Sequence, residues 1–370
     1  MKKTGMKMAA CLMALGLAGT GLSGCGGAKS AETTAAAETT AAAETTAAPE
    51  TTAAAETTAA PETTAAPEAA AAEEKKEEEK AEEAGDEEEN YDTGDASLDN
   101  PRNGDEIGEQ ELLVVSFGTS FNDSRRLTIG AVEDSLEKAF PEWSVRRGFT
   151  SQIIIDHVKK RDGVQIDNVQ EALDRAVKNG VKTLVVQPTH LMNGLEYADL
   201  SAELAAGADA FEKIALGEPL LTSDEDFSRV ADALVEATKE YDDGATAICF
   251  MGHGTEAESN AVYAKMQTVF EGKGMKNYFV GTVEAKPDLE DVLKAVQENK
   301  DYKRVVLRPM MIVAGDHANN DMAGDEPDSW KSVFEGAGYE VVCVVEGLGG
   351  IPAVQEIFAE HAQAAMDSLK

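Results

Sequence analysis

Cysteine and basic residues are scarce in this 370-residue chain. Of its four cysteines, Cys11 and Cys25 lie near the N-terminus, whereas Cys249 and Cys343 lie inside apolar runs, where cysteine usually behaves as a small buried hydrophobe. The sequence therefore predicts no disulfide framework. Lysine and arginine total 33 against 69 acidic residues, and the chain after residue 108 has no basic stripe, which argues against nucleic acid as a partner.

Residues 1–25 predict an export signal. Three lysines precede the apolar stretch 8–18, which is too short to be a stable membrane span. The signal ends on Leu22-Ser23-Gly24-Cys25, which looks like the lipobox of bacterial lipoproteins, in which the cysteine is diacylated and becomes the new N-terminus. We expect a lipid at Cys25 that holds an exported protein on the outer face of the cell membrane, periplasmic or extracellular. The alternative is a plain secretory peptide with a chance cysteine.

Residues 26–108 predict a disordered linker. The sequence Ala-Glu-Thr-Thr-Ala-Ala repeats with occasional proline, and the run 73–90 is dominated by glutamate and lysine. Roughly half of the formal charge of −36 lies between residues 29 and 110. Such a composition has too little apolar surface to offset chain entropy, so the linker should stay extended and solvated.

Beyond residue 108, short apolar runs alternate with amphipathic segments, which is typical of a parallel sheet covered by helices. Strands are expected at 111–117, 144–149, 183–187, 213–216, 245–251, 277–282, 304–309 and 340–345. Helical periodicity covers most gaps, including 126–139, 168–178, 226–241, 260–270, 289–297 and 353–369. The predicted fold class is α/β.

This region contains an internal duplication. Three pairs of segments align between its halves: 185–196 on 306–317, 117–119 on 251–253, and 148–151 on 281–284. The sequence therefore predicts two similar four-stranded parallel α/β units, an N-terminal half over 109–243 and a C-terminal half over 244–370.

The alignment places three metal-competent side chains of the second half in equivalent loop positions: His253, Glu284 and His317. The first half carries Thr119, Ser151 and Glu196 there. All follow the carboxyl ends of strands, where open α/β sheets bind ligands. Two imidazoles and a carboxylate suit Zn²⁺, Co²⁺, Ni²⁺ or Fe²⁺, and a hydrolytic zinc site could use the same set with a metal-bound water.

Glycines flank the first of these histidines. Gly252 and Gly254 would let the chain turn sharply at His253 and let a bulky ligand approach closely. Glycines here could instead cradle a phosphate, but neither Gly-x-Gly-x-x-Gly nor Gly-x-x-x-x-Gly-Lys-Ser/Thr occurs at this position. We therefore expect no nucleotide.

Several motifs carry a resemblance to a known family. They are Val-Val-Ser-Phe-Gly-Thr-Ser (114–120), Asn-Gly-x-Glu-Tyr (193–197), Phe-Met-Gly-His-Gly (250–254), Gly-x-Val-Glu (281–284), Ala-Gly-Asp-His-Ala-x-Asn-Asp-Met (314–322), Asp-Ser-Trp-Lys (328–331) and Gly-Leu-Gly (347–349). In order and spacing they resemble the anaerobic sirohydrochlorin cobaltochelatases of the CbiK type, which are class II chelatases. The resemblance implies two Rossmann-like halves around a tetrapyrrole cleft, with no need for ATP.

The resemblance also implies roles for residues. His253 and His317 would ligate the incoming Co²⁺, or Fe²⁺ or Ni²⁺. Glu284 would complete the site or balance its charge, and proton acceptance would be shared between one histidine and Glu284. Glu196 would face the cleft from the other half. The hydroxyls of Thr119, Ser120 and Ser151 could bind the carboxylates of the tetrapyrrole or could equally cap helices. A cleft-lining role suits His190, whereas His157 and His361 fall in expected helices and are given no function.

The export signal is unusual for an enzyme of a cytoplasmic pathway. One hypothesis is an extracytoplasmic chelatase that acts on sirohydrochlorin or a related tetrapyrrole. The other is a surface lipoprotein that binds haem, another tetrapyrrole or metal for an uptake system without turnover. The sequence leaves open a homo-oligomer and an uptake-system partner.

Overall fold

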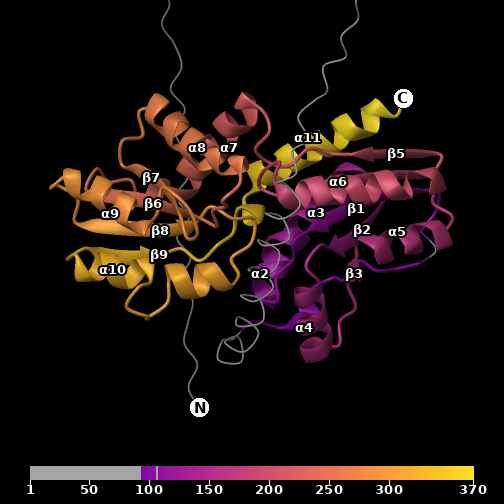
Figure 1. The fold of residues 1–370 in the computed structure, drawn as a ribbon, viewed down its shortest axis with the longest axis horizontal. Coiled ribbons are helices and arrows are strands. Elements are labelled where there is room, and N and C mark those ends of the chain that lie inside the picture. The colour runs from indigo at the N-terminus through magenta and orange to yellow at the C-terminus, as the bar shows by residue number, and fades with distance from the viewer. Residues whose placement is uncertain (1–92, 106) are drawn as a thin grey trace, which may run out of the picture. The chain divides into compact units, whose positions relative to one another are not determined.

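The computed structural model describes residues 93–105 and 107–370, which form two parallel sheets with helices on both faces of each (Figure 1). The first sheet has the order β3-β2-β1-β4-β5, with β1 (Gln110–Ser116), β2 (Ser144–Phe149), β3 (Asp167–Asn168), β4 (Thr183–Pro188) and β5 (Lys213–Leu216). The second has the order β7-β6-β8-β9, with β6 (Thr246–Gly252), β7 (Tyr278–Thr282), β8 (Arg304–Pro309) and β9 (Glu340–Cys343). The α/β class is confirmed, and the short strand β3 gives the first sheet one strand more than expected. The predicted signal, Cys25 and the linker up to residue 92 lie outside the described residues. Residues 93–103, which the sequence placed in the extended, solvated linker, instead pack against the folded region, because Asp99 and Arg102 are buried in ion pairs with it.

Helices follow most strands. In the first half they are α2 (Asn122–Leu127), α3 (Ile129–Ala139), α4 (Gln152–Asp162), α5 (Val169–Lys178), α6 (Leu195–Gly207) and α7 (Asp224–Thr238). In the second half they are α8 (Ala261–Gly272), α9 (Leu289–Glu298), α10 (Trp330–Gly336) and α11 (Pro352–Ser368). Short helical turns include η2 (Ala96–Leu98) and the π-helical turn η6 (Ala318–Met322). The predicted boundary between residues 243 and 244 falls between α7 and β6, and none of the described helices is long and apolar enough to span a membrane.

Both faces of each sheet are buried, which explains why the central strands β1 and β6 are mostly apolar runs. In β1, Leu112 and Val114 pack in a core with α3 and α11, whereas Leu113 and Val115 pack in a core with α5 and α6. The second sheet is arranged likewise, with α7 and α8 over one face and α9, α10 and η6 over the other.

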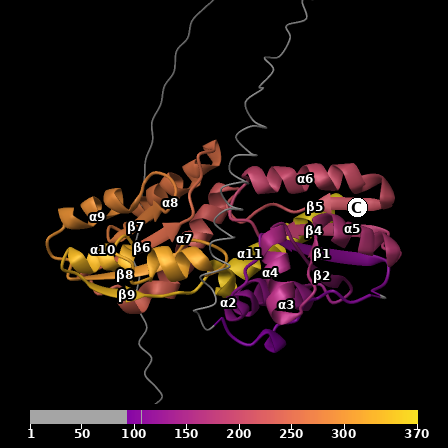
Figure 2. The same cartoon turned by 60° about the horizontal axis from the view of Figure 1, so that its bottom comes forward.

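The last helix of each half packs away from its own sheet. Helix α7, which follows β5, packs against α8 of the second half, whereas the C-terminal helix α11 packs against α3, β4 and β5 of the first half. Figures 1 and 2 show α11 reaching from the second half across to the first. A single buried cluster contains Phe227 of α7, Phe358 of α11 and core residues of both sheets. The two halves therefore share a core.

The strand registers confirm the duplication but correct one part of the alignment. Val115 pairs with Gly148 and Pro188, just as Met251 pairs with Gly281 and Pro309. Met251 is therefore the counterpart of Val115, two residues earlier than the sequence alignment placed it.

This correction changes the partner of the first histidine. The counterpart of His253 is Phe117 rather than Thr119. The glycines after these two residues support this pairing. Gly118 and Gly254 both adopt left-handed backbone conformations, with φ of 110° and 92°. Segments 148–151 and 281–284 do match as expected, since the N–H of Ser151 donates to the carbonyl of Phe117 and that of Glu284 to the carbonyl of His253.

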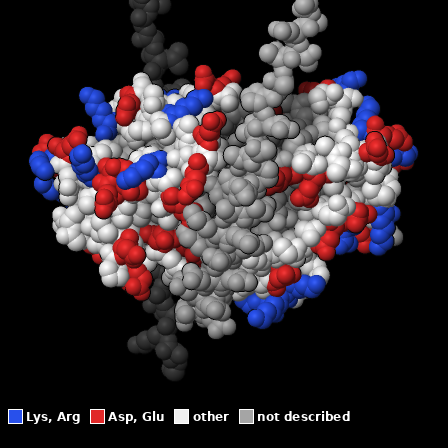
Figure 3. Space-filling view, viewed as in Figure 1, with Lys and Arg blue, Asp and Glu red and all other residues white. Residues whose placement is uncertain are grey.

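Charged side chains of both signs share the surface. On the face seen in Figure 3, the described Lys and Arg side chains are interspersed with Asp and Glu and form no continuous stripe.

Candidate metal and substrate site

The end of β6 holds His253 in a tightly packed turn. A Cβ added at Gly252 would lie 2.1 Å from Cε1 of Tyr263, and one added at Gly254 would lie 2.8 Å from the nitrogen of Ala285. The buried Tyr263 hydroxyl accepts a hydrogen bond from the Gly254 N–H at 3.3 Å, and burial raises the pKa of Tyr263 to about 12, so the phenol stays protonated. The two glycines are therefore required by close packing, which fixes the backbone on both sides of the histidine.

Three side chains of the second half converge at this point. His253, Glu284 and His317 each offer one ligand atom within 4.8 Å of the other two. The two imidazole rings meet edge to face with their centroids 4.7 Å apart. Glu284 is brought here because its N–H donates to the carbonyl of His253 at 2.9 Å. The geometry thus assembles the three residues that the sequence singled out, at the spacing of a metal site.

The Nδ1 atom of each histidine contacts a hydrogen-bond acceptor. Nδ1 of His317 lies 2.7 Å from Oδ2 of Asp321, and Nδ1 of His253 lies 2.7 Å from the carbonyl oxygen of Gly254. Both partners are acceptors, so a neutral imidazole at either position would donate from Nδ1 and present Nε2 as its ligand atom for a metal. Metal-binding histidines are typically oriented in this way by a carboxylate or a carbonyl.

Asp321 was not identified from the sequence as a site residue. It lies four residues after His317, across a π-helical turn, and such turns are frequent at functional sites. The spacing of four residues in a helical segment is the signal that could have found it.

A cavity of about 300 Å³ opens beside the two histidines. Ligand pockets usually span about 300–1,000 Å³. Both halves line it, and its apolar wall includes Phe117, Ile153, Leu191, Met192, Met311 and Ile312. An apolar cavity with a few convergent polar groups suits a large hydrophobic ligand with specific polar contacts.

The predicted first-half residues have different positions. Thr119, Ser120 and Glu196 line the cavity. Ser151 is not among the lining residues. Its Oγ accepts a hydrogen bond from the N–H of Ile154 at 3.4 Å and caps α4. Of the two roles left open for Ser151, the structure supports the helix cap.

Two further histidines line the cavity from the first half. His190 is where a cleft-lining residue was expected, at the end of β4, with Nε2 3.3 Å from Oε2 of Glu196. Burial lowers the pKa of His190 to about 4 despite that carboxylate, so its imidazole is neutral at physiological pH. His157 of α4 also lines the cavity, although its helical context gave it no function. Its place four residues after Ile153, on the cavity side of the helix, is the signal that could have identified it.

This arrangement can hold a divalent metal and accept protons. Two neutral imidazoles and a carboxylate bind borderline divalent metals, and the carboxylate offsets the metal charge. The cavity leaves room for a ligand beside the metal, so a second molecule can approach the ion.

Most of the described chain is similar in sequence to a known protein family. Residues 110–367 match the family described as Cobalt chelatase (CbiK). The sirohydrochlorin cobaltochelatase of Salmonella typhimurium is 34% identical over 259 residues, which cover 70% of this chain and 97% of that protein. The sirohydrochlorin cobaltochelatase CbiKC of Nitratidesulfovibrio vulgaris is 30% identical over 260 residues, covering 70% of this chain and 91% of the relative.

A solved structure shares the fold. SirB from Bacillus subtilis with Fe³⁺ superposes with a TM-score of 0.51 at 13% identity, covering 70% of this chain and 97% of SirB. At this identity the likeness concerns the fold alone.

Proposed function

Because this chain belongs to the cobalt chelatase (CbiK) family, we propose that it inserts Co²⁺ into sirohydrochlorin or a related tetrapyrrole without ATP, on the outer side of the membrane. The relatives in Salmonella typhimurium and Nitratidesulfovibrio vulgaris carry the name of this activity, and the match covers nearly all of their length. One observation carries the proposal: His253, Glu284 and His317 converge beside a cavity that both halves line.

The reaction exchanges two protons of the macrocycle for one metal ion. Insertion of M²⁺ requires that two pyrrole N–H protons leave, that water is stripped from the metal, and that the inner nitrogens face it. His253 and His317 would hold the ion through Nε2, with Nδ1 fixed by Gly254 and Asp321. As the ion moves into the ring, a released histidine nitrogen or the Glu284 carboxylate can accept a proton and pass it to solvent.

The cavity wall would place the macrocycle against the metal. Apolar side chains from both halves suit the faces of a planar ring, while the hydroxyls of Thr119 and Ser120 and the carboxylate of Glu196 are polar groups at the wall. We propose that the hydroxyls orient the carboxylates of the substrate and that Glu196 faces the ring from the first half. No step in this scheme uses a nucleotide.

The location outside the cytoplasm is proposed from the sequence of residues 1–25, and lipidation of Cys25 would tether the enzyme. Mass spectrometry of the mature N-terminus tests this part separately. Diacylated Cys25 is expected, and an unmodified N-terminus would overturn the anchor while leaving the chemistry in place.

The activity is tested with the full-length chain under anaerobic conditions. Sirohydrochlorin is mixed with Co²⁺, Fe²⁺ or Ni²⁺ in the absence of ATP, and absorbance follows formation of the metallated ring. We expect insertion to be faster than in protein-free controls, and fastest with Co²⁺. Insertion no faster than in those controls, together with tight haem binding, would overturn the enzyme and favour the surface lipoprotein that binds tetrapyrrole for uptake.

A further inference from the structure

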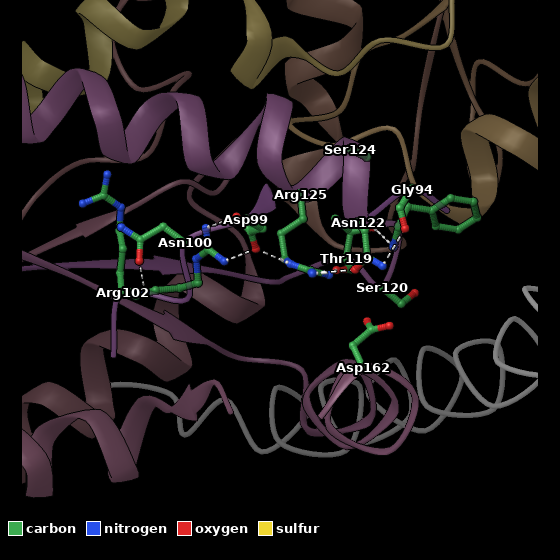
Figure 4. A network of polar contacts seen from close by, with 12 residues as sticks. Gly94, Asp99, Asn100, Arg102, Thr119, Ser120, Asn122, Ser124, Arg125 and Asp162 are labelled. Atoms are coloured by element: carbon green, nitrogen blue, oxygen red, sulfur yellow. Dashed lines mark hydrogen bonds and ion pairs between the residues drawn. The ribbon is translucent and has the colours of Figure 1, made fainter. Parts of the chain in front are cut away.

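The segment that precedes the family match is fastened to the domain by buried charges. The match begins at residue 110, yet residues 93–103 lie along α2 and α3 and are here called the strap. Figure 4 shows Asp99 of the strap beside Arg125 of α2, with Thr119 on the other side of Arg125. We propose that the strap positions the metal and substrate site, with Asp99 as its central positioning residue.

Asp99 is the carboxylate through which the strap reaches α2. Its side chain is 3% exposed, and its Oδ2 accepts from Nε of Arg125 at 2.7 Å and from Nη1 of Arg147 at 2.6 Å. Burial alone would raise the pKa of Asp99, but the hydrogen bonds and positive charges of Arg147 and Arg125 outweigh burial and hold it below its ordinary value. Arg147 also pairs with the buried Glu133, whereas the other hydrogen bonds of Arg125 go to neutral groups. Loss of the Asp99 charge therefore affects Arg125 most.

Arg125 connects this ion pair to the cavity wall. Its Nη1 donates to the carbonyl of Thr119 at 3.1 Å and its Nη2 donates to Oδ1 of Asn122 at 2.6 Å. Thr119 and Ser120 line the cavity. The guanidinium thus spans from the strap to the loop that forms part of the wall, and its position depends on the charge of Asp99.

The strap also holds the start of α2 through its backbone. The carbonyl of Thr93 accepts from the N–H of Asp123 at 2.8 Å, and the carbonyl of Gly94 accepts from Nδ2 of Asn122 at 3.2 Å. These contacts and the Arg125 pair clamp both ends of the first turn of α2.

Helix α2 in turn braces the loop of the second histidine. Oγ of Ser124 accepts a hydrogen bond from the N–H of Ala314 at 2.9 Å, and Ala314 precedes His317 by three residues. A Cβ at the adjacent Gly315 would lie 3.2 Å from Oγ1 of Thr119, so the two loops are in close contact. A path of direct contacts therefore runs from Asp99 through α2 to the loop of the other half that carries His317.

The test compares full-length Asp99→Asn, which keeps shape and removes charge, with Asp134→Asn as matched control. Asp134 also pairs with the strap, through Nη2 of Arg102 at 2.5 Å, but its side chain is 74% exposed and it is not among the residues that line the cavity. We expect Asp99→Asn to weaken Co²⁺ binding on the order of 10-fold, as loss of groups that orient metal ligands does. Amide hydrogen exchange of residues 117–124 and 312–317 should also speed up, with both readouts unchanged in Asp134→Asn and partly restored in Asp99→Glu.

Ser124→Ala keeps the proposal falsifiable if Asp99→Asn does not fold, because it removes the brace without touching the buried ions. Its effect on Co²⁺ affinity should match that of Asp99→Asn and should not add to it in the double variant. Equal Co²⁺ affinity and equal exchange at 312–317 in the parent and Ser124→Ala would overturn the proposal, as would an equal effect of Asp134→Asn. The Co²⁺ affinity measurement rests on the proposed function, whereas the hydrogen-exchange measurement does not. If the parent protein fails to bind Co²⁺, that result counts against the proposed function. The hydrogen-exchange rates then decide on their own whether the strap positions the site.

Discussion

The two halves of this protein have the same backbone frame and different loop chemistry. Strands pair in the order β2-β1-β4-β5 in one half and β7-β6-β8-β9 in the other, with matching registers. Three equivalent positions carry Phe117, Ser151 and Glu196 in the first half and His253, Glu284 and His317 in the second. The second half carries the three proposed metal ligands, whereas the first half supplies part of an apolar wall, a helix cap and a cavity-lining carboxylate.

The comparison teaches that the backbone turn was kept while its side chains diverged. Gly118 and Gly254 keep the same left-handed conformation, and the amides of Ser151 and Glu284 keep the same hydrogen bond to the preceding loop. A duplicated frame therefore presents two sets of side chains to one cavity, and each set can specialise without altering the fold.

The largest effect is expected from removing a metal ligand. His253→Ala and His317→Ala should each lower Co²⁺ affinity and metal insertion by more than about 100-fold, since even residues that only orient ligands cost 10 to 100-fold. Isothermal titration with Co²⁺ measures this, with circular dichroism to check the fold. Glu196→Gln, at the position equivalent to His317, should leave Co²⁺ affinity unchanged, and an equal loss there would mean that both halves hold the metal.

A second contrast concerns the buried histidine of the first half. The folded state holds His190 with a pKa of about 4, below the 6.5 of an unfolded chain, so the unfolded state binds more protons between these values. The stabilising effect of neutral His190 is complete above pH 6.5 and is lost as pH falls toward 4, by about 3 kcal/mol. Urea unfolding across this range measures it in the parent and in His190→Gln, which should show a flatter dependence. A slope equal to that of the parent would contradict the assignment.

The paired glycines test whether the two turns are physically equivalent. Gly118→Ala and Gly254→Ala should each destabilise by about 1–2 kcal/mol from the left-handed backbone alone. Close contacts add to this, because the new Cβ would lie 2.6 Å from Phe149 and 2.8 Å from the nitrogen of Ala285 respectively.

Gly163→Ala is the matched control for this pair, since Gly163 is also left-handed but a Cβ there meets nothing within 4 Å. Denaturant midpoints should therefore shift less for Gly163→Ala than for the other two. Co²⁺ affinity should fall only for Gly254→Ala, because that turn holds His253. A loss of affinity in Gly118→Ala would argue against the division of roles between the halves.

The smallest effects are expected for the equivalent residues Ser151 and Glu284. Substitution of Ser151 should change the unfolding free energy, and substitution of Glu284 should change the Co²⁺ affinity. Ser151→Ala removes a helix cap and should cost about 1 kcal/mol of unfolding free energy, with Co²⁺ affinity unchanged. Glu284→Gln keeps an oxygen donor and removes only the charge, so it should weaken Co²⁺ binding by no more than about 10-fold, with unfolding free energy changed by less than about 0.5 kcal/mol. Thermal unfolding and Co²⁺ titration are carried out on both variants. Weaker Co²⁺ binding in Ser151→Ala would contradict the different roles assigned to the two residues.

Strand positions and the three metal-competent residues could be predicted from the sequence because both depend on local pattern. Strand β8 matches the expected 304–309, since a buried parallel strand is a plain apolar run. The alignment at His253 failed by two residues because shared glycines suggested one match, whereas the pairing of Val115 and Met251 with neighbouring strands sets another.

Other features depend on partners far along the chain. An amphipathic pattern shows that α7 and α11 bury one face, but not which sheet covers it. Asp99 stands in a polar segment, and its burial follows only from the approach of Arg125 and Arg147. His157 could not be assigned from its helix alone, because the cavity it lines is made by loops of both halves.

The exchange of α7 and α11 makes the two halves inseparable as folding units. A chain that ended after the first half would leave α7 without α8 and would leave one face of the first sheet without α11. A half-length ancestor with this topology would have needed a second copy of itself to bury its core, as domain-swapped dimers do. The single chain can thus be understood as a covalently joined swapped pair, in which only the second copy carries the proposed metal ligands.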